Sequence, residues 1–152
     1  MDLENAYDKI YRYVYFRMKN QTIAEDITQE TFLRWISQRG NLRDYEIKYL
    51  YTIARNLCVD EYRRVKPDGL PEDYEAAVAA REDQLVERLT VRHAIARLPA
   101  EDQEILLLRY VNNESVGTIS NALGISRFAL YRRLKNATDQ LRAYLEDSDD
   151  EG

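Results

Sequence analysis

Two amphipathic helical segments joined by a very short turn lie in the last third of this 152-residue chain. The segments cover residues 115–123 and 126–144, with Gly124 and Ile125 between them. Gly124 stands where such a turn needs a residue that tolerates a positive φ, and Ser126 is a favourable N-cap for the second segment. We therefore predict a helix, a tight turn and a second helix in this region.

The second segment has one apolar stripe and one basic face. Its apolar residues recur at helical spacing, at Leu130, Leu134, Ala137, Leu141 and Leu145. The opposite face carries Arg127, Tyr131, Arg132, Lys135 and Asn136. A second helix with an exposed basic face is typical of a DNA-binding helix-turn-helix. An ordinary helical hairpin in a bundle would show the same pattern, so the pattern alone leaves both interpretations open.

The distribution of charge favours the DNA-binding interpretation. The whole chain has a net charge of −5, but residues 91–145 hold eight Lys/Arg against five Asp/Glu, a net charge of +3. Residues 1–66 carry +2, whereas residues 67–90 and 146–152 carry −5 each. The acidity therefore lies in two short segments, and the low pI does not argue against binding to nucleic acid.

Helical periodicity dominates the chain and predicts an all-α fold. In the N-terminal part it predicts helices over residues 3–19, 22–38 and 47–65, with Thr22 as the N-cap of the second. Ile36 is expected on the core side of that second helix.

Breaks in this pattern predict two small helical domains joined by a linker. Pro and Gly residues interrupt it from residue 67 onward. We expect an N-terminal domain over residues 1–66, an acidic linker over 67–84 and a C-terminal helix-turn-helix domain over 85–145. Residues 146–152 have no apolar content and are expected to form a disordered acidic tail.

The composition argues against several other classes of protein. Cys58 is the only cysteine, so no intrachain disulfide can form, and its place in an apolar-periodic helix suggests a small core residue. His93 is the only histidine, so no metal site is expected. No signal peptide and no transmembrane run is evident, and we expect a soluble, cytoplasmic protein. Catalytic constellations and phosphate-binding glycine loops are also missing, which predicts a protein that is not an enzyme and needs no cofactor.

Two blocks of sequence resemble one known family. AEDITQETF at residues 24–32 and LYTIARNLCVD at residues 50–60 are similar to the N-terminal domain of extracytoplasmic function (ECF) sigma factors, the minimal two-domain type of the bacterial sigma-70 family. Leu98 and Pro99, EILLLRY at residues 104–110 and ALGIS at residues 122–126 are similar to their C-terminal domain. Because the blocks occur in the right order at compatible spacing, the resemblance is more specific than the helix-turn-helix alone.

The resemblance implies a function and its partners. It implies a sigma factor that binds core RNA polymerase, through the beta-prime coiled coil and the beta subunit, and directs promoter-specific transcription initiation. Asp26, Gln29 and Glu30 match the polymerase-binding residues of the family and share one helix face, where two carboxylates and an amide suit a basic partner. An anti-sigma factor is a further partner that the sequence leaves open, and no membrane insertion is expected.

The resemblance also implies two sets of DNA contacts. For opening of the −10 promoter element it points to residues 42–64, with candidate contacts at Tyr45, Tyr49, Tyr51, Arg55, Asn56, Arg63 and Arg64. The tyrosines are candidates for stacking on flipped bases, although we expect two of the three to be packing residues instead. Asn56 would bind a base edge and the arginines the DNA backbone. For the −35 element the candidate contacts are Arg127, Phe128, Tyr131, Arg132, Arg133 and Lys135, with Arg133 expected on a phosphate. Tyr49 stands where the family commonly has Trp, so the base preference cannot be transferred.

Two other functions compete with this interpretation. A helix-turn-helix regulator that binds an operator without polymerase would explain residues 115–144 but leaves the AEDITQETF block without a purpose. A helical interaction protein with no role on DNA would also leave the local net charge of +3 unexplained.

Overall fold

The computed structural model describes residues 3–39, 46–65 and 90–150, and in these ranges the chain is helical and contains no strand. The elements are α1 (Leu3–Met18), α2 (Gln21–Arg39), α3 (Ile47–Val65), α5 (Thr90–Ala96), α6 (Ala100–Leu106), the π-helical turn η2 (Leu107–Val111), α7 (Val116–Leu123) and α8 (Arg127–Asp150). The predicted all-α fold is confirmed. No helix in the described ranges is long and apolar enough to cross a membrane.

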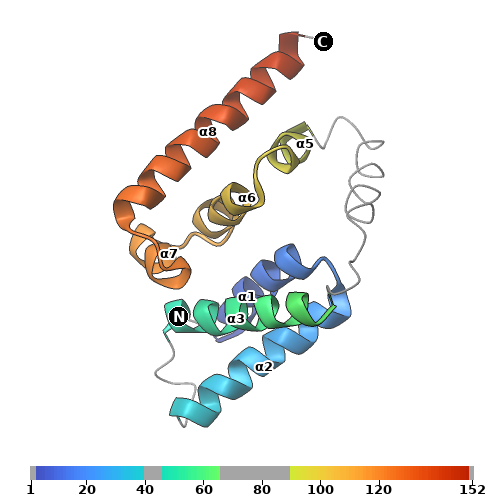
Figure 1. Cartoon of the computed structure of the whole chain (residues 1–152), viewed down its shortest axis with the longest axis vertical. Coiled ribbons are helices and arrows are strands. Elements are labelled where there is room, and N and C mark those ends of the chain that lie inside the picture. The colour runs from blue at the N-terminus through green and yellow to red at the C-terminus, as the bar shows by residue number, and fades with distance from the viewer. Residues whose placement is uncertain (1–2, 40–45, 66–89, 151–152) are drawn as a thin grey trace.

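The first three helices pack against one another and form the N-terminal half of the molecule (Figure 1). Their shared core contains Ile10 and Val14 of α1, Ala24 of α2, and Leu50 and Ala54 of α3, each with no exposed surface. Cys58 belongs to the same core, as predicted, and burial raises the pKa of its thiol to about 12. The thiol is therefore protonated and unreactive at neutral pH.

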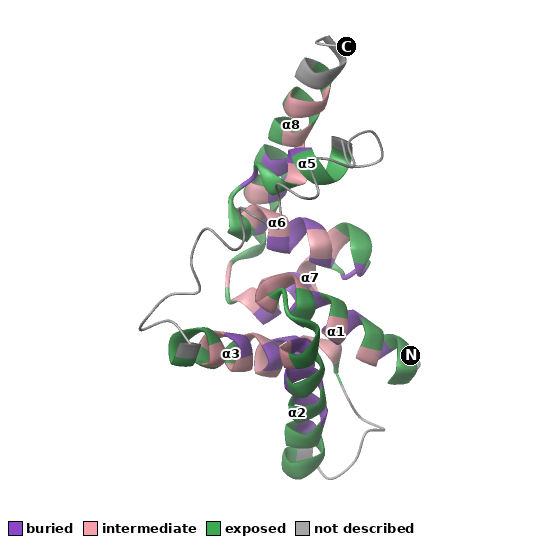
Figure 2. Cartoon of the chain, turned by 90° about the vertical axis from the view of Figure 1, so that its right-hand side faces the viewer, coloured by how far each residue is buried: buried purple, intermediate pink, exposed green. Residues whose placement is uncertain are grey.

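In the C-terminal half, α5, α6 and α7 pack against the long helix α8 (Figure 1). The stripe predicted for this helix faces inward, because Leu130, Leu134 and Ala137 are buried while Leu141 and Leu145 are half-buried. Buried and exposed residues alternate around each helix in both halves of the molecule (Figure 2). Each helix therefore keeps one face for solvent or for a partner.

The turn between α7 and α8 confirms the predicted helix-turn-helix. Gly124 has a φ of 68° and ends α7 in the left-handed conformation, with its N–H directed to the carbonyl of Ser120. The Ser126 hydroxyl accepts a hydrogen bond of 3.0 Å from the N–H of Ala129 at the start of α8. Ser115 caps α7 in the same way, since its hydroxyl accepts from the N–H of Thr118 at 3.1 Å.

The structure differs from the sequence-based predictions at three places. Asn20, not Thr22, is the N-cap of α2, and its Oδ1 accepts a hydrogen bond of 3.0 Å from the N–H of Ile23. The cap lies two residues earlier than predicted because the chain turns at Lys19, which has a φ of 55°. Ile36 is 37% exposed and lies at the edge of the core. α8 continues to Asp150, so residues 146–150 are helical; a helix already nucleated by a packed stripe extends at little cost.

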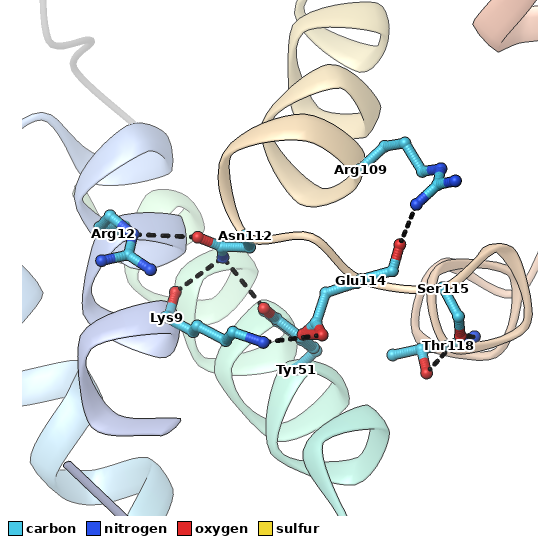
Figure 3. A network of polar contacts seen from close by, with 8 residues as sticks. All are labelled: Lys9, Arg12, Tyr51, Arg109, Asn112, Glu114, Ser115 and Thr118. Atoms are coloured by element: carbon cyan, nitrogen blue, oxygen red, sulfur yellow. Dashed lines mark hydrogen bonds and ion pairs between the residues drawn. The ribbon is translucent and has the colours of Figure 1, made fainter. Parts of the chain in front are cut away.

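The expected linker over 67–84 and the expected domain start at residues 85–89 lie outside the described residues. The relative position of the two halves could not be predicted from the sequence. In the structure they touch, because α7 packs against α3 and the turn after η2 contacts α1 (Figure 3).

The geometry at Gly124 predicts a substitution with a purely conformational cost. A Cβ at this position would meet nothing within 4 Å, so Gly124→Ala introduces no clash and only the strain of a left-handed backbone. We expect a loss of about 1 kcal/mol in the free energy of unfolding, measured by urea denaturation. Gly124→Asn is the control and should lose less, since Asn tolerates this conformation. Equal losses for Ala and Asn would contradict the assigned strain.

Candidate functional site

The exposed face of α8 brings together the polar and aromatic residues predicted there. Arg127, Phe128, Tyr131, Arg132 and Lys135 are all exposed. At 3.6 residues per turn they occupy an arc of about 140° on the helix. The two aromatic rings are unusually open, with 84% of Phe128 and 58% of Tyr131 exposed. Large apolar rings left in water beside basic groups suggest a face that meets a partner with both charge and apolar edges.

Arg133 lies outside this arc. It is half-buried, and its guanidinium is 3.4 Å from the carboxylate of Glu101 at the start of α6. The helical step of about 100° per residue places it on the side of α8 that faces its own domain. The structure therefore separates Arg133 from the other −35 candidates, and its predicted phosphate contact stays a prediction.

Arg127 lies back over the first helix of the motif. A Cβ at Gly117 would lie 2.9 Å from Nη2 of Arg127, so the absence of a side chain at residue 117 makes room for the guanidinium. This contact was not predicted from the sequence. The signal that could have indicated it is a glycine in the first turn of α7, a position where glycine lowers the stability of a helix.

An open groove runs beside the same face of α8. It has a volume of about 410 Å³ and is lined on one side by Arg109, Tyr110 and Val116 and on the other by α8 from Tyr131 to Asp139. Tyr110 is 61% exposed, although it follows a run of buried leucines. The ammonium of Lys135 lies 3.2 Å from the Asp139 carboxylate within this groove.

On α3, three of the predicted −10 residues form a second exposed stripe. Tyr49, Asn56 and Arg63 follow each other at intervals of seven residues and are all exposed. Seven residues make almost two turns, so these side chains lie on one side of the helix over a length of about 21 Å. Tyr45, the remaining aromatic candidate of this set, lies outside the described residues.

The ring of Tyr49 is stacked on an aromatic partner. Its centroid is 6.2 Å from that of Trp35 on α2, with 24° between the planes, and the Lys48 ammonium lies 5.2 Å from the Tyr49 centroid. Trp35 is 3% exposed and packs against one side of the Tyr49 ring, which is itself 40% exposed.

The arginines along α3 differ in their exposure and in whether a carboxylate of the chain binds them. Arg64 binds the carboxylate of Glu61 through two hydrogen bonds of 2.7 and 3.2 Å, and the Arg64 hydrogen bond lowers the pKa of Glu61. Arg55 is half-buried. Arg63 is exposed within the stripe and is a more available cation than Arg64 or Arg55.

Tyr51 is a packing residue in this structure. It is 1% exposed, and its ring meets that of Tyr13 edge-on at 5.5 Å. Burial and the nearby Glu114 carboxylate raise the pKa of its hydroxyl well above the ordinary value. Of the aromatic candidates on α3, only Tyr49 is therefore accessible for stacking.

The third candidate surface lies on α2. Asp26, Gln29 and Glu30 are exposed on one face, where Glu30 forms an ion pair of 3.2 Å with Arg34 one turn later. Leu33 continues this face and is 59% exposed. Acidic and amide groups around an exposed leucine can hold a partner that offers basic and apolar side chains together.

The comparisons with known proteins match both halves of the chain to one family. Residues 3–67 match the family described as Sigma-70 region 2. Residues 88–141 match the family described as Sigma-70, region 4. The first match contains the α2 and α3 surfaces, and the second contains the helix-turn-helix.

Individual relatives agree with this assignment. The chain is 31% identical to the ECF RNA polymerase sigma factor SigW of Bacillus subtilis over 96% of its own length and 88% of the relative. It is 32% identical to the ECF RNA polymerase sigma factor BldN of Streptomyces coelicolor over 81% of its length, but spans only about half of that protein, 51%. The fold is similar to that of the sigma factor RpoE in its complex with the anti-sigma factor NepR from Bartonella quintana, with a TM-score of 0.65 at 16% identity over 95% of this chain and 94% of that chain.

The stack of Tyr49 on Trp35 can be tested directly because Trp35 is the only tryptophan. Tyr49→Ala should expose the indole, increase acrylamide quenching of its fluorescence and lower the free energy of unfolding by about 1 kcal/mol. Tyr49→Phe keeps the ring and should behave like the parent. Unchanged quenching in Tyr49→Ala would show that the ring does not cover Trp35.

Proposed function

This chain belongs to the ECF RNA polymerase sigma factors, and on that premise we propose that it binds core RNA polymerase and directs transcription initiation at promoters with −10 and −35 elements. The observation that carries the proposal is the presence, in one chain, of an exposed acidic and amide face on α2 and an exposed basic and aromatic face on α8. An operator-binding regulator would need only the second of these faces.

The α2 face is the surface that we assign to the beta-prime coiled coil. Asp26 and Glu30 supply two carboxylates one turn apart, and Gln29 supplies an amide between them. Such groups accept charge-assisted hydrogen bonds from arginine and lysine. Leu33 adds an apolar contact at the end of the same face, as is usual at the centre of a protein interface.

The stripe on α3 is the surface that we assign to the −10 element. Opening a duplex costs a few kcal/mol per unstacked base, and stacking the freed base on an aromatic ring recovers about 1–3 kcal/mol. Tyr49, which is 40% exposed and stacked on Trp35, offers such a ring. Asn56 can bind a base edge, and Arg63 and Arg64 can bind the phosphates along the same side of α3.

The exposed arc of α8 is the surface that we assign to the −35 element. A helix of this diameter fits the major groove, where Arg132 and Lys135 can reach base edges or phosphates. Phe128 and Tyr131 are suited to apolar contact with thymine methyl groups.

By analogy with the other members of the family, we infer that phosphoryl transfer is carried out by the polymerase and not by this chain. We include an anti-sigma factor among the partners, because the similar RpoE is held by one.

The proposal is tested by the α2 face. Asp26→Lys, alone and combined with Glu30→Lys, should weaken binding to core polymerase by about 2–5 kcal/mol, because each change sets a cation against a basic partner. Binding is measured by co-purification with core enzyme, and function by run-off transcription on genomic fragments.

Asp8→Lys is the matched control, since it makes the same charge change at an exposed position of α1. It should leave binding to core unaltered. If the parent protein neither binds core nor yields a transcript, the sigma factor proposal fails. If Asp26→Lys and its combination with Glu30→Lys both bind core like the parent, only the assignment of the α2 face fails.

A second prediction concerns the arc on α8. Arg132→Ala should weaken binding to a −35 duplex by about 1–3 kcal/mol if the guanidinium reads a base edge, and should relax preference at one base pair. A phosphate contact would instead weaken all sequences alike and reduce the salt slope by about one. Fluorescence anisotropy at several salt concentrations distinguishes the two.

Arg133→Ala is the comparison, because it removes the same charge from the side of α8 that faces α6. Its effect on DNA binding should be clearly smaller than that of Arg132→Ala. Equal effects would show that the recognition face is rotated from the arc described above.

A further inference from the structure

Gly117, in the first turn of α7, has no role that its own helix explains. Glycine weakens a helix relative to alanine, because its backbone loses more freedom on folding. A common reason to keep a glycine is a left-handed backbone, but among the glycines in the described ranges only Gly124 has a positive φ. Residue 117 lies in a regular helix, where other side chains are accommodated. The reason for a glycine at this position must therefore lie in its surroundings.

The side chain of Arg127, from the start of α8, occupies the space beside Gly117. An added Cβ at residue 117 would lie 2.9 Å from Nη2 and 3.6 Å from Cζ of this arginine. Heavy atoms in favourable contact are about 3.5–4.0 Å apart, so the guanidinium and a Cβ cannot both keep these positions. The next neighbour, Oγ of Ser115, would be 3.9 Å from the Cβ. Of these neighbours, only Arg127 would be displaced.

The guanidinium of Arg127 lies over α7 without a carboxylate to neutralise it. The first turn of α7 contains no acidic residue, and the Ser115 hydroxyl is already bonded to Thr118 (Figure 3). Arg133 pairs with Glu101, whereas Arg127 forms no ion pair with any residue that the structure describes. Arg127 therefore keeps its charge and its five N–H donors for a partner outside the chain.

The direction of the Arg127 side chain decides which part of a DNA duplex it meets. In a helix-turn-helix, the N-terminal residues of the second helix contact base edges, while the first helix crosses the phosphate backbone. Arg127 is the first residue of α8 and lies at one edge of the exposed arc, about 140° from Arg132. In front of α8 its guanidinium would face the bases. Laid back over α7, it faces the phosphates.

We propose that Gly117 is a positioning residue that turns Arg127 away from the base edges and onto a phosphate of the −35 element. It thereby removes a guanidinium from the base-reading side at the start of α8. The DNA target in this inference rests on the proposed function, whereas the direction of the Arg127 side chain rests on the contacts alone.

The direction of Arg127 changes which bases α8 can read. Arginine binds O6 and N7 of guanine through two hydrogen bonds, the commonest specific contact in the major groove. Phe128, the next residue, is 84% exposed and offers an apolar ring, which suits a thymine methyl group. A side chain at residue 117 should therefore return Arg127 to the bases and add a guanine preference that the parent lacks.

Gly117→Ala is the substitution that tests this role. Its Cβ meets the far end of a flexible side chain, and alanine favours a helix more than glycine does, so the variant should fold. The assay uses holoenzyme reconstituted with core polymerase and a promoter library randomised over the −35 element. Transcripts made with Gly117→Ala should show a preference of about tenfold for guanine at one position, relative to the parent.

Two further variants separate positioning from a structural effect. Arg127→Ala should lower binding to all −35 sequences alike and reduce the salt slope by about one, as the loss of a phosphate contact does. Combined with Gly117→Ala it should erase the guanine preference, because the guanidinium is gone. Asn121→Ala, at an exposed position of α7, also favours the helix but adds no atom at residue 117, and should keep the base preference of the parent.

A measurement without DNA decides the geometry by itself. In NMR spectra of the full chain, nuclear Overhauser effects should connect the Hα protons of Gly117 with the side chain of Arg127. Gly117→Ala should shift the side-chain resonances of Arg127 more than those of Arg132.

Absence of these Overhauser effects, or a guanine preference that survives Arg127→Ala, overturns the positioning role. A Gly117→Ala holoenzyme that transcribes with the base preference of the parent overturns it as well. A parent chain that yields no transcript with core polymerase sinks the sigma factor proposal and with it the DNA target of Arg127. The NMR result would still decide the contact between Gly117 and Arg127.

Discussion

The burial of one stripe of α8 against α6 and α7 determines what the C-terminal half can do. Leu130 and Ala137 have no exposed surface and Leu134 has 8%. Removing a buried leucine side chain costs about 2–5 kcal/mol, whereas most surface substitutions change stability by less than about 0.5 kcal/mol. The rotation of α8 about its axis is therefore set by the stripe. The side chains left outside can therefore vary without loss of the fold, and they are Arg127, Phe128, Tyr131, Arg132 and Lys135.

The contact between the two halves contains buried polar groups, whose energetics differ from those of an apolar stripe. A buried ion pair adds little net stability, since the loss of hydration offsets most of the attraction, but breaking one partner is strongly unfavourable. These polar groups therefore determine the orientation of the two halves more than they add to the free energy of the contact. They are the Lys9–Glu114 ion pair and the amide of Asn112. One apolar core runs through both halves and carries the stability of the fold, and the buried polar groups specify how the halves meet.

Periodicity alone predicted the helices and their faces, because a stripe of apolar residues is a local property. α3 begins and ends where the spacing predicts, and Gly124 and Ser126 occupy the backbone roles expected of them. Local chemistry also explains the smaller errors, since Asn20 and Thr22 are both good caps and only the turn at Lys19 decides between them. Arg133 is not part of the basic face that the helical angle predicts, and in the structure it pairs with Glu101 on the side toward α6.

What could not be predicted is non-local. Lys9 and Glu114 are 105 residues apart, and nothing near Lys9 in the sequence distinguishes it from a lysine in solvent. The same holds for Tyr51, whose role depends on Asn112, 61 residues later. Tyr49 and Tyr51 are two residues apart, yet one is exposed and the other buried, because they point about 160° apart around α3. α3 thus contributes to three surfaces: Leu50 and Ala54 to the core, Tyr51 to the contact with Asn112, and Tyr49 with Asn56 to the exposed stripe. Because α3 packs against α7, the position of this exposed stripe relative to the helix-turn-helix is set by buried residues of the same helix.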